Sequence, residues 1–474
     1  MKKLTDILKN TPVREVCGDT AAAIGGLVYD SRAVKPGDCF FAVPGTQSDG
    51  HDYIPIAVEK GAAAIVCERM PADAAEGVAY VLVGDSAGAM ADMAAAFYDY
   101  PSRELKLVGI TGTNGKTTTA TLLYDLVRAM GYKAGLISTV VYKIDGREVE
   151  ATHTTPDSIR LNAMMREMAD AGCAYCFMEC SSHAIVQERT RGLDFAGGIF
   201  SNITHDHLDY HKTFAEYIRA KKLFFDGLPK GAFALTNADD RNGRVMVQNT
   251  AAAVSAYSLR AMADFRCKIV EMHLDGMLLR IDGQELWVGL LGRFNAYNLL
   301  AVYGAAALLG LNRGEVLRVL SMLHAVSGRF EKIRAANGTT AIVDYAHTPD
   351  ALENVIQTIE EIRTPGQQLI VVCGCGGDRD RTKRPEMAAI AVKYATTAVF
   401  TSDNPRHESP EAILDDMVAG LEPGARYLRI ADRAEAIRTA VMLSRPGDII
   451  LVAGKGHETY QIVGDVKHPF DDRE

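Results

Sequence analysis

The sequence predicts an α/β protein with three domains. Short apolar runs typical of buried strands alternate with helical stretches along most of the chain, and polar motifs follow several strands directly. The chain has 474 residues, 48% of them apolar, which is more than one hydrophobic core usually accommodates. We therefore expect an N-terminal α/β domain at residues 1–101, a central domain at 102–326 and a C-terminal domain at 327–474.

Charge and hydropathy exclude several classes of protein. The net charge is −9 and the isoelectric point is near 5.8, which argues against a nucleic-acid-binding protein. No apolar run reaches membrane-spanning length, and no secretory leader is recognisable at the start of the sequence. We expect a cytoplasmic protein, a monomer by default, whose partners are small molecules and which neither binds nucleic acid nor inserts into a membrane.

The nine cysteines are interpreted as reduced thiols, because their number is odd and no leader directs the chain to an oxidising compartment. Cys173, Cys176 and Cys180 have a spacing that suggests a metal site. However, residues 175–178 are typical of a buried strand, which would place these side chains on both of its faces. We favour buried structural thiols at these positions.

The N-terminal domain is indicated by four apolar runs separated by helical stretches. They lie near residues 26–32, 37–43, 62–67 and 79–83. Ser31 follows the first run, and a polar loop at 44–51 that contains Thr46 and His51 follows the second. Polar groups at strand ends are common ligand contacts, although this signal is not specific by itself.

The central domain begins with a strand, a glycine-rich turn and a helix. The apolar run at 105–110 leads into Gly-Thr-Asn-Gly-Lys-Thr-Thr at 112–118, and a helix is expected from there to about residue 130. Exposed N–H groups, Lys116 and the Thr117 hydroxyl would bind phosphates and Mg²⁺. Ile110 replaces the first glycine of the common phosphate-loop pattern, so this loop is a variant. It predicts a nucleoside triphosphate site; the alternative is an ordinary turn with a chance lysine.

Two later strands of the central domain are expected to end in polar motifs. The run at 175–178 leads into Glu179, our first candidate for a further Mg²⁺ ligand, because carboxylates at strand ends suit this cation. The run at 198–200 leads towards His207. The residues alone leave open whether His207 binds a metal or only makes hydrogen bonds.

Turn signals predict two antiparallel features in the central domain. Asp-Gly at 145–146 predicts a hairpin, and Asp-Gly at 275–276 and 282–283 predicts an antiparallel arm between residues 265 and 291. Helices are expected from about residue 213 and from about 295 to 309.

The C-terminal domain is predicted to contain a Rossmann-like parallel sheet, entered through a hinge at Ser327 and Gly328. Strands at 369–373, 398–401 and 449–453 each end in a polar motif, and helices are expected at about 350–361, 385–395 and 433–444. In a parallel sheet of this kind, ligands bind at the carboxyl ends of the strands.

Taken together, the motifs resemble the Mur ligase family, ATP-dependent enzymes that add amino acids to the cytoplasmic peptidoglycan precursor. The resemblance extends over nearly the whole chain. The shared motifs are Asp-Ser-Arg at 30–32, the loop at 112–117, His-Thr-Thr-Pro-Asp at 153–157, Glu-Cys-Ser-Ser-His at 179–183, Asp-His-Leu-Asp-Tyr-His at 206–211, Gly-Arg-Phe-Asn at 292–295, Gly-Arg-Phe-Glu at 328–331, Asp-Tyr-Ala-His-Thr-Pro-Asp at 344–350 and the three strand-end motifs of the last domain.

The resemblance implies a central domain like that of the phosphate-loop ATPases, a first domain that binds uridine diphosphate, and a defined reaction. ATP would phosphorylate the D-glutamate γ-carboxylate of a UDP-linked muramoyl dipeptide, and an amine of meso-diaminopimelate would attack the acyl phosphate. Alternatives are addition of L-lysine, a folylpolyglutamate synthetase-like ligase, and a non-catalytic binding protein with the same fold.

The resemblance also implies roles for particular residues. The catalytic group is Lys116, Lys221 and His207, and the Mg²⁺ positions are Thr117, Glu179, His207 and Lys221. The ATP positions are Gly112, Thr113, Asn114, Gly115, Lys116, Thr117, Thr118, Asn295, Asn298, Arg329, Asp344 and His347. The UDP-precursor positions are Ser31, Thr46, His51, Thr154, Thr155, Ser181, Gln187 and Arg189. For the nucleotide residues, and Asn298 in particular, a capping or loop role is the alternative.

Lys221 matches a lysine that is commonly carbamylated by CO₂ in the family, which would turn a cation into an anion that ligates Mg²⁺. We favour it over the adjacent Lys222; the alternative is a surface lysine on an amphipathic helix.

The last implied group would select diaminopimelate. It consists of Arg379, with Arg384 as the substitute, and of Asp403, Asn404, Pro405, Arg406, Gly454 and Glu458. Arg406 would grip the distal carboxylate bidentately while Pro405 stiffens its loop. The alternative is that residues 404–405 form only a turn and that Arg406 faces water.

Overall fold

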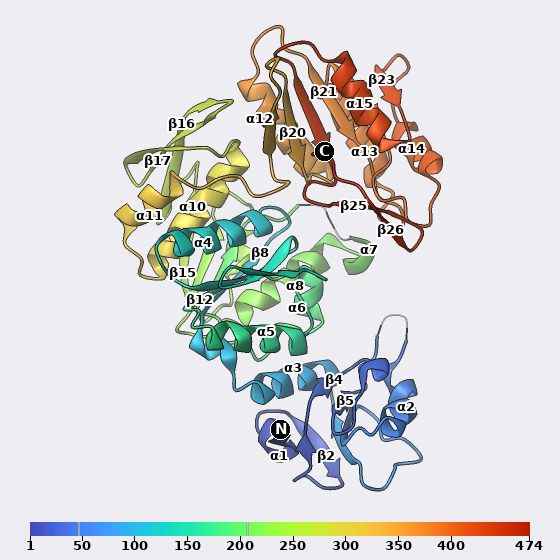
Figure 1. Cartoon of the computed structure of the whole chain (residues 1–474). Coiled ribbons are helices and arrows are strands. Elements are labelled where there is room, and N and C mark those ends of the chain that lie inside the picture. Colours follow the sequence, from blue (N-terminus) through green and yellow to red (C-terminus); the bar gives the residue numbers. More distant parts are fainter. Residues whose placement is uncertain (46–47, 205, 207) are drawn as a thin grey trace.

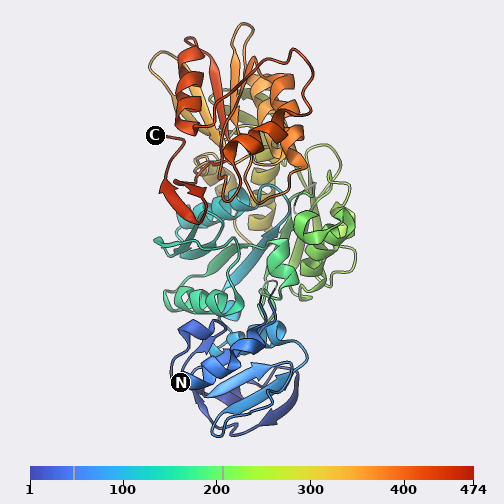
Figure 2. The same cartoon turned by 90° about the vertical axis from the view of Figure 1, so that its right-hand side faces the viewer.

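The computed structural model describes residues 1–45, 48–204, 206 and 208–474. The protein is an α/β protein with three large sheets that follow one another along the chain (Figure 1). The blue N-terminal part lies at one end, the central part in the middle and the red C-terminal part at the other end. The perpendicular view shows the same order (Figure 2). Within the described residues, no helix combines the length and the apolar character needed to cross a membrane.

The N-terminal domain has a five-stranded sheet in the order β2-β7-β6-β5-β4, parallel except for β2. The four predicted strands are present. The short pieces β1, β2 and β3 were missed because they lack a continuous apolar run. The elements are β1 Lys2–Lys3, α1 Leu4–Ile7, β2 Val13–Cys17, β3 Ala23–Ile24, β4 Leu27–Val28, β5 Cys39–Phe41, α2 Ile54–Glu59, β6 Ala64–Cys67, β7 Ala79–Val83 and α3 Ser86–Phe97.

The central domain has an eleven-stranded sheet in the order β11-β10-β9-β12-β8-β13-β14-β15-β16-β17-β18. Its middle is parallel, and both ends are antiparallel, as the turn signals predict. The elements are β8 Lys106–Thr111, α4 Lys116–Ala129, β9 Ala134–Ile137, β10 Val141–Ile144, β11 Arg147–Glu150, α5 Ser158–Asp170, β12 Tyr175–Glu179, α6 Ser182–Val186, β13 Gly197–Phe200, α7 Leu208–His211, α8 Phe214–Asp226, β14 Phe233–Asn237, α9 Gly243–Met246, β15 Ala253–Ser258, β16 Phe265–His273, β17 Gly276–Ile281, β18 Gln284–Val288, α10 Arg293–Leu308 and α11 Arg313–Leu320.

The C-terminal domain has a six-stranded sheet in the order β19-β20-β24-β21-β22-β23, parallel except for β19. The sequence predicted three of these strands; β20 was treated only as a motif. The elements are β19 Glu331–Arg334, β20 Thr340–Asp344, α12 Pro349–Ile362, β21 Leu369–Cys373, α13 Lys383–Tyr394, β22 Thr397–Phe400, α14 Pro410–Val418, β23 Tyr427–Arg429, α15 Arg433–Leu443, β24 Ile449–Ala453, β25 Tyr460–Val463 and β26 Val466–Pro469.

The parallel strands are covered on both faces, which explains their continuous apolar sequences. Along β21, Leu369 and Val371 pack in the core shared with α12 and α13, whereas Ile370 and Val372 pack in the separate core beneath α15. With both faces of the sheet buried, the exposed carboxyl ends of its strands are where polar side chains gather.

The antiparallel arm β16–β18 lies beside the C-terminal domain. The ammonium of Lys332, on β19, donates to the carbonyl oxygens of Leu274 (3.0 Å) and Gly289 (3.5 Å). The chain's single tryptophan, Trp287, is on β18, is half exposed and stacks on the His273 ring at 6.3 Å between centroids. The arm therefore joins the central and C-terminal domains outside the strand-end region.

Two further contacts surround the predicted hinge. Gly328 has φ of +66°, and a Cβ there would lie 2.0 Å from the backbone nitrogen of His457. Near the last residues, the guanidinium of Arg473 donates to Ser327 Oγ at 2.6 Å. A side chain at position 328 would therefore clash with the backbone at His457.

Candidate active site

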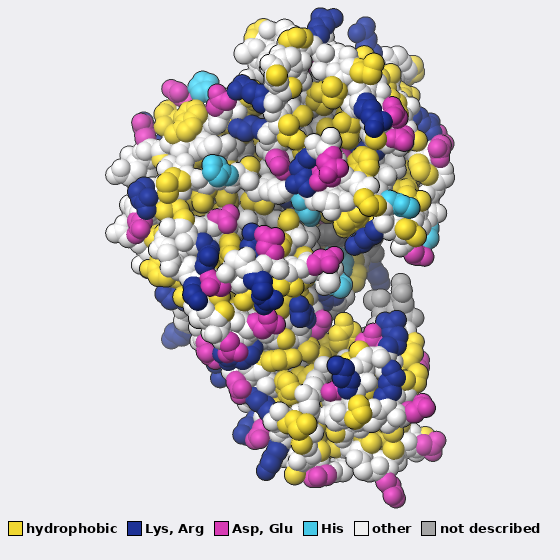
Figure 3. All heavy atoms as spheres, in the orientation of Figure 1, with side chains coloured by type: hydrophobic (Ala, Val, Ile, Leu, Met, Phe, Trp, Pro, Cys, Tyr) yellow, Lys and Arg dark blue, Asp and Glu magenta, His cyan; other side chains and the backbone are white. Residues whose placement is uncertain are grey.

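Two adjoining cavities lie where the central and C-terminal domains meet. The larger, about 510 Å³, extends from the phosphate loop to the ends of β21, β22 and β24. The smaller, about 310 Å³, lies on the other side of the phosphate loop, and Arg329 lines both. In the space-filling view the surface is hollowed between the C-terminal and N-terminal domains (Figure 3).

The phosphate loop joins β8 to α4 and depends on its two glycines. Gly112 and Gly115 have φ of +149° and +87°, and a Cβ would lie 1.9 Å from Ser201 Oγ and 2.4 Å from Asn298 Oδ1 respectively. The Lys116 ammonium donates to the carbonyl oxygens of Gly112 (3.0 Å) and Thr113 (2.9 Å). The loop is therefore packed closely against Ser201 and Asn298, and Lys116 folds back onto its carbonyl oxygens.

Lys116 is electrostatically suited to bind an anion. Burial lowers the pKa of its ammonium, and the carboxylates of Glu179 and Asp206 oppose that shift. Asn114 and Thr117 also line the larger cavity, and Thr118 lines the smaller one. A nucleotide whose terminal phosphates bind this loop would therefore lie next to both cavities.

Glu179, at the end of β12, is buried and is held by neutral donors. Its Oε1 accepts from Thr117 Oγ1 (2.8 Å) and from the Thr139 backbone N–H (2.7 Å), and its Oε2 accepts from Thr139 Oγ1 (3.1 Å). No ion pair among the described residues neutralises it. Thr139 was missed by the sequence prediction, although Ser138 and Thr139 follow β9 as polar residues at a strand end.

These oxygens fit a hard cation. A buried carboxylate without a cationic partner, beside a threonine hydroxyl at a phosphate loop, is the usual protein contribution to a Mg²⁺ site completed by substrate phosphates. Among the described residues, no cluster of three histidine, cysteine or carboxylate side chains could hold a metal. The predicted ligand His207 lies outside the described residues.

Lys221 points into the site from α8, and Lys222 points away. The Lys221 side chain is 1% exposed, and its ammonium donates to the Gly112 carbonyl at 2.7 Å. Burial, reinforced by the neighbouring Lys116, lowers the pKa of Lys221 well below its ordinary value. Lys222 instead pairs with Asp226 at 2.6 Å.

Five of the predicted precursor positions lie together on the wall of the larger cavity, namely Thr154, Thr155, Ser181, Gln187 and Arg189. The Arg189 guanidinium donates to the Thr155 carbonyl (2.7 Å) and to Gln187 Oε1 (2.6 Å). These side chains form one polar surface next to Glu179.

Of the remaining precursor positions, the two that the structure describes, Ser31 and His51, are in the N-terminal domain and line neither cavity. Ser31 is buried at the start of a short 3₁₀ helix capped by Asp30. The ring of His51 is occupied on both sides: Nδ1 donates to Asp49 Oδ1 (2.7 Å) and Nε2 accepts from the Glu68 N–H (2.9 Å). His51 therefore braces its loop, and its assignment as a ligand contact stays a prediction. Thr46 lies outside the described residues.

The smaller cavity contains most of the predicted ATP-base and ribose positions. Asn298, Arg329, Asp344 and His347 line it. Both oxygens of Asp344 accept backbone N–H bonds, from Phe330 and Ala346, each at 2.7 Å, while burial raises the pKa of this carboxyl. Its contribution is to fix the turn after β20.

Asn295 lines neither cavity and supports Asn298, so its assignment as a nucleotide contact stays a prediction. Its amide donates to the Leu291 carbonyl (2.7 Å), and its oxygen accepts from Asn298 (3.2 Å), so it orients Asn298 from beneath. The cavity also contains Tyr297, whose hydroxyl donates to Asp239 at 2.8 Å. Sequence analysis missed this pair because nothing in the local sequence connects the two positions.

The predicted amino-acid positions converge at the far end of the larger cavity. Arg379, Asp403, Asn404, Arg406, Gly454 and Glu458 line it, whereas Pro405 is buried in the turn and does not. Glu458 accepts from Asn404 (2.9 Å) and from the Lys455 ammonium (2.9 Å). Lys455, missed from sequence, is completely buried and supplies the local positive charge.

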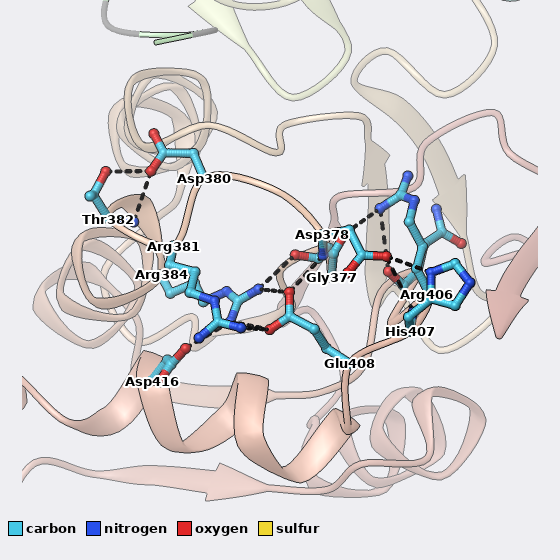
Figure 4. Close-up of polar contacts among 12 residues, drawn as sticks. Gly377, Asp378, Asp380, Arg381, Thr382, Arg384, Arg406, His407, Glu408 and Asp416 are labelled. Atoms are coloured by element: carbon cyan, nitrogen blue, oxygen red, sulfur yellow. Dashed lines mark hydrogen bonds and ion pairs between the residues drawn. The ribbon is translucent and has the colours of Figure 1, made fainter. Parts of the chain in front are cut away.

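Arg384, the substitute for Arg379, is unavailable to a ligand. Its fully buried guanidinium contacts Glu408, Asp416 and the Gly376 carbonyl (Figure 4). A second buried arginine, Arg433, pairs with Asp472 through two bonds of 2.7 Å. Both are structural ion pairs behind the cavity wall.

The two domains touch across the nucleotide region. The Asn114 amide donates to Asp350 at 2.9 Å, and the Arg329 guanidinium donates to Thr117 Oγ1 at 3.2 Å. The walls of the site therefore come from loops far apart in sequence.

A phosphate loop in a central parallel-sheet domain, completed by a second α/β domain, defines the class as nucleotide-dependent ligases, and the chain belongs to the Mur ligase family. Three family models match: the Mur ligase family catalytic domain at residues 23–98, the Mur ligase middle domain at 110–306, and the Mur ligase glutamate ligase domain at 328–456. These matches and the three observed sheets confirm the predicted fold class.

Individual relatives give a more specific match than the family models. The chain is 56% identical to a UDP-N-acetylmuramoyl-L-alanyl-D-glutamate–2,6-diaminopimelate ligase of Phocaeicola vulgatus, covering 100% of this chain and 98% of the relative. It is 55% identical to the enzyme of that name from Bacteroides fragilis, with the same coverage. A solved structure with that name superposes with a TM-score of 0.71 at 31% identity, covering 100% of this chain and 97% of the other.

Proposed function

We propose that the chain is an ATP-dependent ligase of peptidoglycan precursor synthesis in the cytoplasm, which joins meso-2,6-diaminopimelate to UDP-N-acetylmuramoyl-L-alanyl-D-glutamate. The observation that carries this is the single cavity in which the phosphate loop, the surface around Arg189 and the turn containing Arg406 meet. The names of the full-length relatives support the same reaction.

The reaction has two steps. An oxygen of the D-glutamate γ-carboxylate attacks the γ-phosphorus of ATP, the bond to the β,γ-bridging oxygen breaks, and ADP leaves. A neutral amine nitrogen of diaminopimelate then attacks the acyl carbon. The tetrahedral intermediate expels inorganic phosphate, and the nitrogen loses a proton as the amide forms. Because several anionic groups must meet, positioning and neutralisation of charge carry most of the catalysis.

The chain's own groups are placed for these tasks. Lys116 would contact the transferred phosphoryl group from the loop, and Arg189 would orient the precursor's peptide beside it. Thr117 and Glu179 are the described groups that would hold Mg²⁺, which supplies charge neutralisation at the phosphates when bound. Asn298 and Arg329 would contact the nucleotide in the smaller cavity.

Lys221 is proposed to carry a carbamate. Its buried, low-pKa amine is the neutral nucleophile that adds to CO₂ with loss of one proton, and the resulting anion would offset the positive charge of nearby Lys116. Mass analysis of gently handled protein should show the addition on the peptide containing Lys221, and a short carboxylic acid should restore activity to Lys221→Ala. An active, ligand-bound crystal with an unmodified ammonium would exclude the carbamate.

Selection of diaminopimelate over lysine follows from one additional carboxylate. A site that selects it must supply a cation and oriented donors, which lysine would leave unpaired. Arg406 and Arg379 line the end of the cavity that would receive this group. Gly454 through its carbonyl and Glu458 through its carboxylate would meet the distal amino group.

The test is a substrate panel with ATP, the UDP-linked dipeptide and separate amino acids, in which phosphate release is measured. Release should require both the precursor and diaminopimelate. Preference for lysine would move the assignment to the lysine-adding reaction, and binding of all ligands without phosphate release would indicate a non-catalytic protein. A folylpolyglutamate synthetase is disfavoured by the matched N-terminal domain and the relatives' names.

A further inference from the structure

The turn that carries Arg379 is bound directly to the turn that carries Arg406. The Gly377 N–H donates to the Asn404 carbonyl at 2.9 Å, and the Arg406 guanidinium donates back to the Gly377 carbonyl at 2.9 Å. A Cβ at Gly377 would lie 1.8 Å from the Pro405 carbonyl oxygen. The two backbones therefore touch, and the distance between the arginines depends on how this contact is held.

The conformations of both turns require support from outside. Asp378 and Arg406 have φ of +53° and +50°, in the left-handed region that residues with a side chain seldom occupy. Such conformations persist only where surrounding contacts determine them. The residues just before Arg379 and at Arg406 itself are thus the ones whose geometry must be enforced.

Glu408 supplies that enforcement. One carboxylate oxygen accepts from the Asp378 N–H at 2.6 Å, and the same carboxylate receives the Arg384 guanidinium through bonds of 2.8 and 3.0 Å. In Figure 4, Glu408 lies between the turn at Gly377 and Asp378 on one side and Arg381 and Arg384 on the other. Arg384 lowers the pKa of Glu408 to about 2, so the carboxylate stays charged at neutral pH.

Arg384 provides a rigid anchor for this link. It lies at the start of α13, is fully buried, and also donates to the Gly376 carbonyl (3.2 Å) and to Asp416 on α14 (2.7 Å). Asp416 contacts Arg384 from the opposite side and makes no described contact with the turn. The chain thus contains two carboxylates on one guanidinium, of which only Glu408 reaches the turn.

We propose that Glu408 is a positioning residue for selection of the amino acid: it fixes the turn bearing Arg379 at the separation from Arg406 that one distal carboxylate can bridge. The inference rests on the proposed function. Glu408 lines neither cavity and touches no substrate in this scheme. It acts only through the position of the two arginines, so its effect should be confined to substrates that carry the distal carboxylate.

The experiment compares Glu408→Gln with the matched control Asp416→Asn. Both remove one negative charge from Arg384, but only the first weakens the link to Asp378. Glu408→Gln should lower kcat/KM for diaminopimelate by about ten- to a hundred-fold, mainly through KM, as is typical for groups that support ligand-contacting residues. The KM values for ATP and the precursor, and the weak use of lysine, should change by less than about two-fold. Asp416→Asn should resemble wild type throughout.

Three results would overturn the inference. They are an unchanged KM for diaminopimelate in Glu408→Gln, an equal loss for lysine, and an equal loss in Asp416→Asn, since the last two are what a merely structural pair would give. If Glu408→Gln does not fold, Glu408→Asp is tested instead, because it keeps the negative charge beside Arg384 on a shorter side chain. An intermediate loss confined to diaminopimelate is expected there, and a wild-type ratio of diaminopimelate to lysine use would refute the role.

The wild-type enzyme separates this inference from the proposed function. If it fails to prefer diaminopimelate, the function assignment fails whatever the variants do. If it prefers diaminopimelate and Glu408→Gln keeps the full preference, only the role of Glu408 fails.

Discussion

At the phosphate-loop end of the larger cavity, hydrogen bonds to the backbone of the loop make most of the contacts, whereas at the amino-acid end ion pairs between distant side chains make them. Lys116 is held by the carbonyls of Gly112 and Thr113, within four residues of itself. The turns at the other end are held by Arg384 with Glu408 and by Arg433 with Asp472, the latter 39 residues apart.

This difference separates two tasks. Every ATP-dependent ligase must place the same phosphates, and a short loop with two glycines does so through its backbone, which Ser201 and Asn202 support. Selecting one amino acid requires side chains from the ends of several strands, and their relative positions are set by buried charges behind the wall. Variants at the phosphate-loop end should therefore change only the rate of the chemical steps. Variants at the amino-acid end should change recognition of the amino acid or the stability of the fold.

The largest expected effect is at the phosphate end. Lys116→Ala should lower kcat by at least about ten-thousand-fold, or above 5 kcal/mol in activation free energy, because charge developing on the phosphoryl group loses its cation. The thermal unfolding midpoint should change little, because Lys116 is only partly buried and its described hydrogen bonds go only to the carbonyl oxygens of its own loop. Lys222→Ala, which breaks only an outward-facing pair, is the control and should keep wild-type turnover. Near-normal turnover of Lys116→Ala would remove the phosphate-loop assignment.

At the amino-acid end, Asp472→Asn should act on stability first. Arg433 and Asp472 are both completely buried, and leaving one charge of such a pair without its partner costs about 3–5 kcal/mol. Urea unfolding followed by circular dichroism should show the loss. Replacing both residues in Arg433→Met/Asp472→Leu should recover most of it, since no unpaired charge remains. A double variant as unstable as the single one would mean that the ion pair itself is required.

Arg406→Ala should affect recognition without affecting ATP chemistry. Loss of a charged partner of the distal carboxylate should cost about 2–5 kcal/mol in kcat/KM for diaminopimelate. The KM for ATP should stay constant, and the weak use of lysine should change little. Arg406→Lys keeps the charge but not the bidentate geometry and should be intermediate. A variant that still discriminates fully between the two amino acids would contradict the role of this arginine.

The smallest expected effect is a pH dependence of the same turn. His407 lies between Asp378 (2.8 Å) and Asp465 (3.2 Å), and these carboxylates raise its pKa. A raised pKa means that the contact stabilises the turn fully below the unfolded value of about 6.5 and that this contribution is lost as pH rises through the folded value. The KM for diaminopimelate should therefore increase slightly from pH 6.5 to 8.5, and His407→Gln should flatten the profile. An unchanged slope in that variant would assign the dependence to another group.

The contrast between the two ends of the cavity also explains how much of the fold and of the site could be predicted from sequence. The predicted strands, the phosphate loop and the antiparallel arm follow from local patterns, and the structure contains most of them with boundaries shifted by one or two residues; the run at 26–32 is a strand only at Leu27–Val28, and β9, β14 and β15 were not predicted. The supporting contacts do not follow from local patterns. His51 and Asn295 look like ligand contacts, yet the Glu68 N–H and the Leu291 carbonyl already occupy them.

The polar strand ends at the amino-acid end follow from the strand pattern, but their role with diaminopimelate came only from the family resemblance, and the buried charges there were missed or misplaced. Arg384 was considered a substitute ligand because an arginine beside a strand end is as available in sequence as Arg379. Only the fold shows that Glu408 and Asp416 enclose it. Lys455 was missed because a completely buried lysine has no distinguishing pattern in the chain.

The single tryptophan offers an optical reporter of domain movement. Trp287 is half exposed on β18, two residues from the Gly289 carbonyl that Lys332 of the C-terminal domain contacts. Rotation of that domain about Gly328 would break this contact and change the surroundings of the indole. Since no other tryptophan contributes to the signal, stopped-flow fluorescence of the unlabelled enzyme should separate nucleotide-linked closure from the chemical steps in time.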